Sequence, residues 1–291
     1  MSKKLWIAES FGKINLGLHV LEKLPTGYHR IETGFAFIEW SDRFEVRQAD
    51  AYELTITNSD LPADSSNLIT RAYNAFETYV GLNQHYHFTV TKQIPAGAGL
   101  GGGSSNAALT FRMLNKMEKA GLPDEDIVDL CRDLGADIPF FVYGKPGIGS
   151  GIGQDIEPAQ IQPDAWILAV YPGFESSTAE AYKHCTPNAE PDFSLKGVLT
   201  EEPVSQWQYL LQNDLEPAVI SRHEMIGNIK DQMIDFGADY AAMSGSGSTV
   251  FGIFEQDFVV INAYESFHGL GLLAKLTRPG FKPDYGIYIK E

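Results

Sequence analysis

The chain has 291 residues, 44% of them hydrophobic, which is enough to bury a sizeable core; at roughly 150 residues per domain, two domains are expected. The 22 basic and 38 acidic residues give a formal net charge of −16, which argues against nucleic acid and anionic membranes as partners because both are polyanions. The two cysteines indicate no disulfide framework, and Cys131 is expected to be a buried thiol. No apolar run is long enough for a membrane span or a signal peptide, so a cytoplasmic protein is predicted.

Short segments of alternating apolar residues predict a β-rich first part of the chain. Strands are expected at 14–20 and 86–90, each half-buried, with further β segments around 35–44 and 54–57. Pro25-Thr26-Gly27 predicts a turn, and the spacing of apolar residues over 67–80 predicts a helix.

The middle and last parts of the chain mix short helices and strands. Helices are expected after residue 106 and over 123–134, followed by a glycine-rich hairpin at 144–153 and a strand at 166–171. The last third predicts a helix, a strand–glycine loop–strand over 241–254, a helix at 258–267 and a strand at 272–276. This order indicates an α+β fold, with domains at 1–157 and 158–291.

The segment P-A-G-A-G-L-G-G-G-S-S-N-A-A, from Pro95 to Ala108, carries the strongest functional signal. Glycines let backbone N–H groups turn toward a ligand, and the start of a helix adds unpaired donors and the positive end of a dipole. The segment therefore predicts a loop that binds the phosphates of ATP. A glycine-rich turn that only caps a helix at Ser104 is the structural alternative.

Two other phosphate-loop patterns fit this segment less well. The lysine-bearing P-loop requires a lysine where the chain has Gly103. The dinucleotide pattern is matched by Gly97, Gly99 and Gly102, but the preceding strand alternates polar and apolar residues, whereas parallel strands of that fold usually run continuously apolar. A dinucleotide-dependent oxidoreductase remains an alternative.

Residues Pro95 to Ser105 resemble the phosphate loop of the GHMP kinases. Further pieces resemble that family in order and spacing: F-G-K-I-N-L-G-L at 11–18, G-Y-H at 27–29, L-G-A-D-I-P at 134–139 and M-S-G-S-G-S at 243–248. The resemblance covers most of the chain and is weakest from 187 to 237. It implies a two-domain α+β GHMP-kinase fold, with the active site in the cleft between the domains, and ATP-dependent phosphorylation of a small alcohol with Mg²⁺.

Lys13, Asn15 and Asp137 are the candidate reaction-centre residues. Asp137 lies just before Pro139, so the residues alone allow either a base that projects into a cleft or a helix N-cap. Lys13 and Asn15 share one face of a strand, which by itself suggests a solvated face. The resemblance implies that Asp137 is the catalytic base, that Lys13 pairs with it and polarises the attacking hydroxyl, and that Asn15 hydrogen-bonds the substrate.

The resemblance also assigns the nucleotide site. It implies that Asn67 contacts adenine. ATP chemistry implies a Mg²⁺ ion, which Ser104 or Ser105 is expected to approach, and no metal site made of protein ligands alone is predicted. The loop residues expected to bind ATP are Pro95, Gly97, Gly99, Leu100, Gly101, Gly102, Gly103, Ser104 and Ser105. Asn106 departs from the family, which usually has aspartate after the two serines. Lys92 is expected either at the rim of this site or as a solvated lysine at a strand end.

The G-Y-H and L-G-A-D-I-P pieces resemble the family members whose alcohol substrate carries a cytidine diphosphate group. Tyr28 and His29, which alone could be ordinary surface residues, are then expected to stack on and hydrogen-bond the cytosine. Tyr182, where phenylalanine is usual, is expected on the other side of the base. The remaining candidates for substrate binding are Thr178, Lys183, Gly245 and Ser246.

Three matters stay open at this point. The acceptor could be another alcohol, of the homoserine or mevalonate type. The protein could be a catalytically silent metabolite sensor on the same fold, although Lys13, Asp137 and both serines are present. It is expected to be a monomer or a homodimer.

Overall fold

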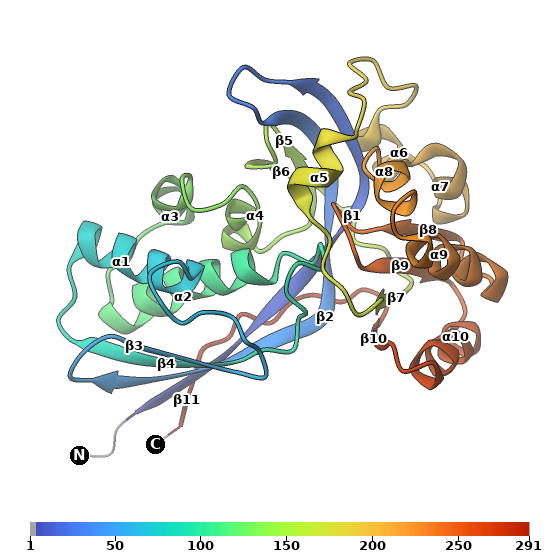
Figure 1. Ribbon diagram of the computed structural model, residues 1–291. Helices are drawn as coiled ribbons and strands as arrows, with labels where there is room; N and C mark the ends of the chain where they lie inside the picture. Colours follow the sequence, from blue (N-terminus) through green and yellow to red (C-terminus); the bar gives the residue numbers. More distant parts are fainter. Residues whose placement is uncertain (1–3, 291) are drawn as a thin grey trace.

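The computed structural model describes residues 4–290 and contains two β-sheets. The first sheet has seven strands, with the order β11-β1-β2-β4-β3 and a β5–β6 hairpin attached to β2, and the second has four, in the order β10-β7-β9-β8 (Figure 1). The strands of the first sheet are β1 (Leu5–Lys23), β2 (His29–Ala49), β3 (Glu53–Thr57), β4 (His85–Thr91), β5 (Gly147–Ser150), β6 (Asp155–Pro158) and β11 (Tyr288–Lys290). Those of the second are β7 (Trp166–Tyr171), β8 (Tyr240–Met243), β9 (Val250–Phe254) and β10 (Leu273–Thr277).

The long antiparallel β1–β2 hairpin links the two halves of the molecule (Figure 1). The predicted turn joins the two strands, with a hydrogen bond from the Leu24 N–H to the Tyr28 carbonyl. The strand predicted at 14–20 is confirmed, but its expected half-burial is wrong, because both of its faces are buried. Ile14 and Leu16 pack in the core between the two sheets, and the polar residues between them are covered as well.

Four helices cover one face of the first sheet: α1 (Leu68–Val80), α2 (Gly102–Glu118), α3 (Asp124–Cys131) and α4 (Ile138–Tyr143) (Figure 1). Their apolar residues, such as Tyr73 and Phe111, join Phe44 and Phe88 of the sheet in one core cluster. Cys131 is fully buried in this cluster, as predicted. Its helix ends at Cys131, earlier than the expected end at Gly135.

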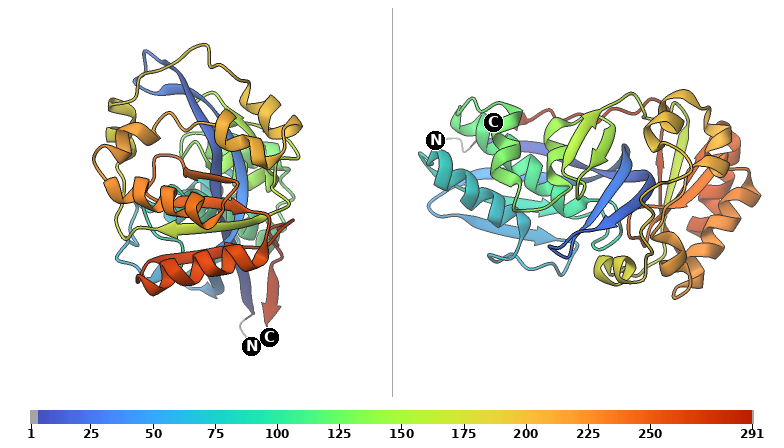
Figure 2. Two further views of the ribbon diagram at one scale, coloured as in Figure 1. Left: turned by 90° about the vertical axis from the view of Figure 1, so that its right-hand side faces the viewer. Right: turned by 90° about the horizontal axis from the view of Figure 1, so that it is seen from above.

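The second sheet is packed between helices and the first sheet. Ile226 and Phe267, from α9 and α10, pack with Leu168 and Val250 on its outer side, where Figure 2 shows these helices. Phe251 belongs to the core cluster that also contains Ile14 of β1. The helices of this part are α5 (Thr178–Lys183), α6 (Leu195–Glu201), α7 (Val204–Leu210), α8 (Glu216–Ile220), α9 (Glu224–Phe236) and α10 (Asp257–Gly269).

The chain end returns to the first sheet, which the sequence pattern did not indicate. After β10, Phe281 packs edge-on against Phe11, with ring centroids 5.4 Å apart, and β11 pairs antiparallel with β1, so that Lys290 lies opposite Leu5. The α+β fold is confirmed, and the domain boundary near residue 157 stays a prediction.

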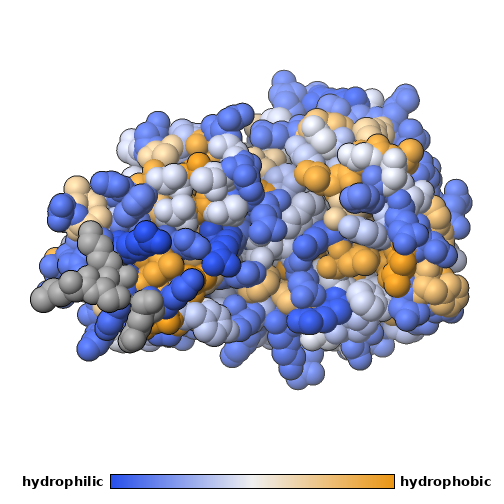
Figure 3. Space-filling view, turned by 90° about the horizontal axis from the view of Figure 1, so that it is seen from below, coloured by the Kyte–Doolittle hydropathy of each residue, from blue (hydrophilic) through white to orange (hydrophobic). Residues whose placement is uncertain are grey.

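The surface carries scattered apolar residues. Figure 3 shows one face, on which apolar patches are separated by hydrophilic residues. Phe258, Leu270 and Leu273 are among the exposed apolar side chains, which is usual for folded proteins. Within residues 4–290, no helix combines the length and the hydropathy that a membrane crossing requires.

Candidate active site

One cavity of about 970 Å³ gathers nearly all of the predicted site residues from both halves of the chain. Ser105 and Asn67 are the two predicted residues that do not line it. The predicted residues that do line it are Lys13, Asn15, Tyr28, His29, Pro95, Gly97, Gly99, Leu100, Gly101, Gly102, Gly103, Ser104, Asp137, Thr178, Tyr182, Lys183, Gly245 and Ser246. The chain therefore brings together residues more than 200 positions apart around one space.

Lys13 is held rigidly in the wall of this cavity. Its ammonium donates to Asn15 Oδ1 at 2.6 Å and to the Gly99 carbonyl at 3.0 Å, and it forms an ion pair with Asp137 Oδ2 at 3.4 Å. Two of the three N–H donors of the ammonium are used by these hydrogen bonds, and its charge is paired with Asp137. The side chain is only 4% exposed and also lies over the Phe35 ring. The spacing alone suggested that Lys13 lies on a solvated strand face, and this prediction is wrong.

Asp137 occupies the residue before α4, but its side chain forms no capping hydrogen bond. The N-cap alternative is therefore wrong. The carboxylate is 31% exposed and faces Lys13, so it is accessible from the cavity while one oxygen is paired. A carboxylate in this position can accept a proton from a bound hydroxyl group.

Asn15 orients the lysine through a short chain of hydrogen bonds. Its Oδ1 accepts from Lys13, its Nδ2 donates to Thr33 Oγ1 at 2.9 Å, and Thr33 Oγ1 donates to the Gly17 carbonyl at 2.6 Å. Thr33 lies four residues after the G-Y-H piece and belongs with it to the family resemblance, which assigned it no role. The contact of Asn15 with the substrate stays a prediction.

The glycine loop presents an open helix N-terminus to the cavity. Gly101 is the N-cap of α2, with φ of 66°, and no side chain caps the helix. Ser104 lies inside α2 and does not cap it, so the predicted cap at Ser104 is wrong, whereas phosphate binding by the loop stays a prediction. The backbone N–H groups of the first turn have no partner within the helix, which makes this end suitable for phosphate. A Cβ on Gly101 would lie 2.9 Å from the Phe141 ring and 3.1 Å from Lys13 Cε, so the loop packs directly against the lysine.

The second glycine loop, at 243–248, fastens onto the first. Ser244 Oγ donates to the Gly99 carbonyl at 2.9 Å, and the Thr249 N–H donates to the Ala98 carbonyl at 3.1 Å. Ser244 and Thr249 are fully buried, and neither was selected from the sequence. Ser244 lies within the M-S-G-S-G-S piece, of which only Gly245 and Ser246 were predicted to bind substrate.

The two serines of the loop have different surroundings. Ser105 is 1% exposed, and its hydroxyl donates to the Phe11 carbonyl at 2.6 Å and is hydrogen-bonded to Ser10. Ser104 lines the cavity. Only Ser104 of the two serines is accessible from the cavity, and its approach to a metal ion stays a prediction.

Asn67 is used as a helix cap. Its Oδ1 accepts the Ile69 N–H at 2.9 Å, and its Nδ2 donates to the Pro62 carbonyl at 2.8 Å. Its neighbours Leu61 and Leu68 line the cavity, whereas Asn67 does not. The contact of Asn67 with adenine stays a prediction.

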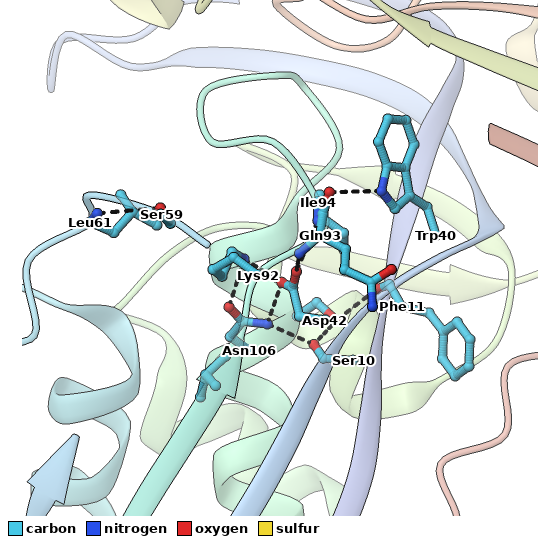
Figure 4. A network of polar contacts seen from close by, with 12 residues as sticks. Ser10, Phe11, Trp40, Asp42, Ser59, Leu61, Lys92, Gln93, Ile94 and Asn106 are labelled. Carbon is cyan, nitrogen blue, oxygen red and sulfur yellow. Dashed lines mark hydrogen bonds and ion pairs between the residues drawn. The ribbon is translucent and has the colours of Figure 1, made fainter. Parts of the chain in front are cut away.

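Lys92 is buried rather than solvated. It is 7% exposed, forms an ion pair with Asp42 and donates to Asn106 Oδ1 at 3.0 Å (Figure 4). It also lines the cavity beside the glycine loop. The solvated alternative is therefore wrong, because the register of β2 places a carboxylate beside Lys92, whereas its place at the nucleotide site stays a prediction.

Aromatic side chains form the other end of the cavity. The Tyr182 and His29 rings are stacked, with centroids 4.9 Å apart and planes at 20°, while Tyr28 is 62% exposed. Burial, and then the charge of Lys23, lower the pKa of His29 below its ordinary value, so its ring is neutral near pH 7. Burial raises the pKa of Tyr182, and the charge of Asp137 raises it further.

The remaining predicted substrate residues lie near α5. Thr178 and Ser246 are joined by a hydrogen bond of 2.8 Å between their hydroxyls, which bridges α5 and the second glycine loop. Lys183 forms an ion pair with Glu180 at 3.4 Å, and its side chain is 66% exposed. A phosphate group that entered the cavity would compete with Glu180 for this lysine.

Comparison with known proteins agrees with this geometry. Residues 67–145 match the model of the GHMP kinases N terminal domain, and residues 199–269 match that of the GHMP kinases C terminal. A 4-diphosphocytidyl-2-C-methyl-D-erythritol kinase of Chlorobium phaeobacteroides is 40% identical over 280 residues, which are 94% of this chain and 97% of the relative. The kinase of that name from Parabacteroides distasonis is 40% identical over 248 residues, covering 84% and 90%.

Solved structures show the same relationship. A crystal structure of 4-(cytidine 5'-diphospho)-2C-methyl-D-erythritol kinase superposes with a TM-score of 0.81 at 29% identity, covering 94% of this chain and 100% of that one. Homoserine kinase from Cytophaga hutchinsonii has a TM-score of 0.73 at 15% identity, covering 100% and 98%, and shares the fold. The chain therefore belongs to the GHMP kinases and, within them, to the 4-diphosphocytidyl-2-C-methyl-D-erythritol kinase family.

Proposed function

We propose that the protein transfers the γ-phosphoryl group of ATP to the 2-hydroxyl of 4-diphosphocytidyl-2-C-methyl-D-erythritol, in the methylerythritol phosphate pathway of isoprenoid biosynthesis. The products are ADP and the 2-phosphate of the substrate. One observation carries the proposal: the Lys13–Asp137 ion pair, at 3.4 Å, lies beside the open N-terminus of α2 in a cavity that extends to a stacked aromatic pair.

The reaction centre follows from the contacts of Lys13. The substrate hydroxyl binds next to Asp137, which accepts its proton as the oxygen attacks the γ-phosphorus. The bond between that phosphorus and the oxygen bridging to the β-phosphate breaks, and the electron pair leaves with ADP. The Lys13 ammonium, fixed by Asn15 and Gly99, stabilises the negative charge that develops on the oxygens during transfer.

The phosphates of ATP are held mainly by the backbone. The N–H groups of the first turn of α2 and the adjoining glycines face the cavity, and a helix N-terminus favours an anion. This arrangement explains how a chain of net charge −16 can bind a polyanion, since the local field comes from aligned amides with Lys13 and Lys92.

The cytidine diphosphate group fits the other end of the cavity. The stacked His29 and Tyr182 rings offer an aromatic face to a pyrimidine. Tyr28, the residue before His29, is exposed, so its ring is free to cover the bound base. A neutral imidazole can both donate and accept a hydrogen bond to the base. Ser246 and Thr178 supply hydroxyls for the diphosphate.

The donor set of the cavity fits a Mg²⁺ ion carried by the nucleotide. Among residues 4–290, no group of three or more His, Cys, Asp or Glu side chains could hold a metal by itself. Magnesium in such sites is usually bound by phosphates and water with one or two protein oxygens, and the Ser104 hydroxyl lines the cavity to serve as one. When bound, the ion offsets the charge of the phosphates.

A substrate-comparison assay tests the proposal. ADP release is measured with 4-diphosphocytidyl-2-C-methyl-D-erythritol, homoserine and mevalonate as acceptors at equal concentration. We expect turnover with the first acceptor alone. Comparable turnover with homoserine or mevalonate would refute the proposed specificity, and binding of ATP and the first acceptor without ADP release would identify a metabolite sensor.

A further inference from the structure

A buried polar network lies directly behind the phosphate-binding loop (Figure 4). Its centre is Asp42 of β2, which is 0% exposed. Asp42 Oδ1 accepts the backbone N–H groups of Gln93 at 2.7 Å and Ile94 at 2.9 Å. Asp42 Oδ2 accepts from the Lys92 ammonium and from Asn106 Nδ2, the latter at 2.9 Å. These four donors use the full acceptor capacity of an ionised carboxylate.

The network holds both ends of the loop. Gln93 and Ile94 immediately precede Pro95, where the loop begins, and Asn106 follows its two serines on α2. One carboxylate therefore fixes the backbone that enters the loop and the helix that leaves it.

Lys92 connects this network to the cavity. Two of its donors are used by Asp42 and Asn106, and within the described part of the chain its third N–H has no acceptor. Lys92 lines the cavity, and a Cβ on Gly102 would lie 3.5 Å from its Nζ. The ammonium thus lies directly against the first residue of α2, with one donor available to a bound nucleotide.

The charges in the network suit an anionic ligand. Asp42 neutralises Lys92, and Asn106 contributes both a donor and an acceptor without adding a charge. A carboxylate at position 106, which is usual in the family, would add a second negative charge beside Lys92. The Asp42–Lys92 ion pair is expected to add little net stability to the fold, because the loss of hydration offsets the attraction between buried charges.

We propose that Asp42 is a positioning residue for the nucleotide: it sets the shape of the phosphate-binding loop through Gln93 and Ile94 and holds the Lys92 ammonium toward the bound nucleotide. Asp42 then governs nucleotide affinity, whereas turnover at saturating ATP depends on Lys13 and Asp137. This inference rests on the proposed function only in that the nucleotide is ATP.

The first test is Asp42→Asn, which keeps an oxygen for the two backbone amides but removes the charge that faces Lys92. Titration calorimetry with ADP and Mg²⁺ should show about tenfold weaker binding, the value expected for loss of a hydrogen bond between charged groups. The KM for ATP should rise by the same factor, while kcat and the KM for the alcohol change by less than about twofold.

Charge relocation separates positioning from general stability. The double variant Asp42→Asn/Asn106→Asp moves the carboxylate from position 42 to position 106. In the wild type, Asn106 Oδ1 lies 3.0 Å from Lys92 Nζ, so the moved carboxylate still contacts the ammonium. The double variant should recover ADP affinity to within about threefold of the wild type, whereas Asn106→Asp alone should weaken it. If the two substitutions instead weaken ADP binding additively, the positioning role is refuted.

Glu118→Gln is the matched control, because it removes a carboxylate at the opposite end of α2. Glu118 accepts hydrogen bonds from the Tyr86 hydroxyl at 2.5 Å and from Asn83 Nδ2 at 2.8 Å, away from the loop. This variant should lower Tm without changing ADP affinity.

Two further comparisons keep the test decisive. If Asp42→Asn does not fold, Asn106→Ala replaces it, because it removes contacts to Lys92 and Asp42 without unpairing a charge; about threefold weaker ADP binding is expected. Unchanged ADP affinity in the folded variant, or a change in kcat alone, would overturn the inference. ADP binding by the wild type without turnover of the cytidine substrate would refute the proposed function and leave the inference standing.

Discussion

Ser244 and Lys13 share one acceptor, the carbonyl oxygen of Gly99. Ser244 Oγ donates to it at 2.9 Å and Lys13 Nζ at 3.0 Å. The Asn15 N–H also donates to Ser244 Oγ, at 3.3 Å. A residue of the second glycine loop is therefore connected to both the phosphate-binding loop and the lysine of the reaction centre, so the two halves of the chain fix the lysine together.

The first prediction concerns this shared acceptor. Ser244→Ala removes the hydroxyl that holds Gly99 and accepts from Asn15, so the Lys13 ammonium loses its fixed position. We expect kcat to fall about tenfold, with a smaller change in the KM for ATP. Steady-state kinetics and a thermal melt check this, and a lower Tm with an unchanged kcat would contradict it.

The second prediction concerns the close approach at Gly99. This residue has φ of 77°, and a Cβ would lie 2.1 Å from the Ser244 carbonyl oxygen. Gly99→Ala should raise the KM for ATP at least about tenfold, since the loops must separate. Gly81→Ala is the matched control, because Gly81 has φ of 79° with open space around it. Equal effects of the two variants on ATP would show that backbone strain alone is responsible.

The third prediction separates the two ends of the cavity. Tyr182→Ala removes the ring stacked on His29 and should raise the KM for the cytidine substrate about tenfold or more, the usual value of stacking on a base. The KM for ATP should not change. Tyr182→Phe keeps the ring and should remain within about twofold of the wild type. Tyr209→Ala, at a side chain that is 76% exposed, is the control.

The fourth prediction follows from the lowered pKa of His29. Burial and the charge of Lys23 favour the neutral ring, so the folded-state pKa lies below the ordinary value of 6.5. As the pH falls below 6.5, the His29 side chain is protonated in the unfolded chain before it is protonated in the folded protein. His29 therefore contributes to the free energy of unfolding above pH 6.5, and this contribution is lost as the pH falls through the lowered folded-state pKa.

The same titration should affect substrate binding. Protonated imidazole has two donors and no acceptor, so the KM for the cytidine substrate should rise as the pH falls through the lowered pKa. His29→Gln, which cannot titrate, should remove this dependence. A pH profile of KM that is the same for both proteins would contradict the role of His29.

Local patterns were sufficient for much of the fold. The spacing of apolar residues predicted α1 and β4 within one or two residues, because each has one buried face. The continuous apolar run over 166–171 predicted β7, which is buried on both faces. β11 was not predicted, since three residues with exposed side chains form a strand only by pairing with β1. The half-burial expected at 14–20 failed because both faces of β1 are covered. Ile14 and Leu16 pack toward the second sheet, and the two glycine loops contact Lys13 and Asn15 on the polar face.

Some features of the site could also be predicted from local sequence, whereas others depend on contacts between distant residues. The glycine content, followed by a helical pattern, indicated a phosphate-binding loop from the residues alone. The helix begins at Gly102, earlier than the expected start after residue 106. The partnership of Lys13 with Asp137 came from family resemblance, since 124 positions separate them and no pattern joins them. The roles of Ser105 and Lys92 depend on Phe11 and Asp42, which only the register of β1 and β2 places beside them.

The most direct measurement is a single-turnover experiment with the wild type and Asp137→Asn at saturating ATP and 4-diphosphocytidyl-2-C-methyl-D-erythritol. Replacing a general base is expected to slow phosphoryl transfer about 10²–10⁴-fold, with the dissociation constant for ADP unchanged. Wild-type transfer rates in Asp137→Asn would contradict the assignment of Asp137 as the group that accepts the hydroxyl proton.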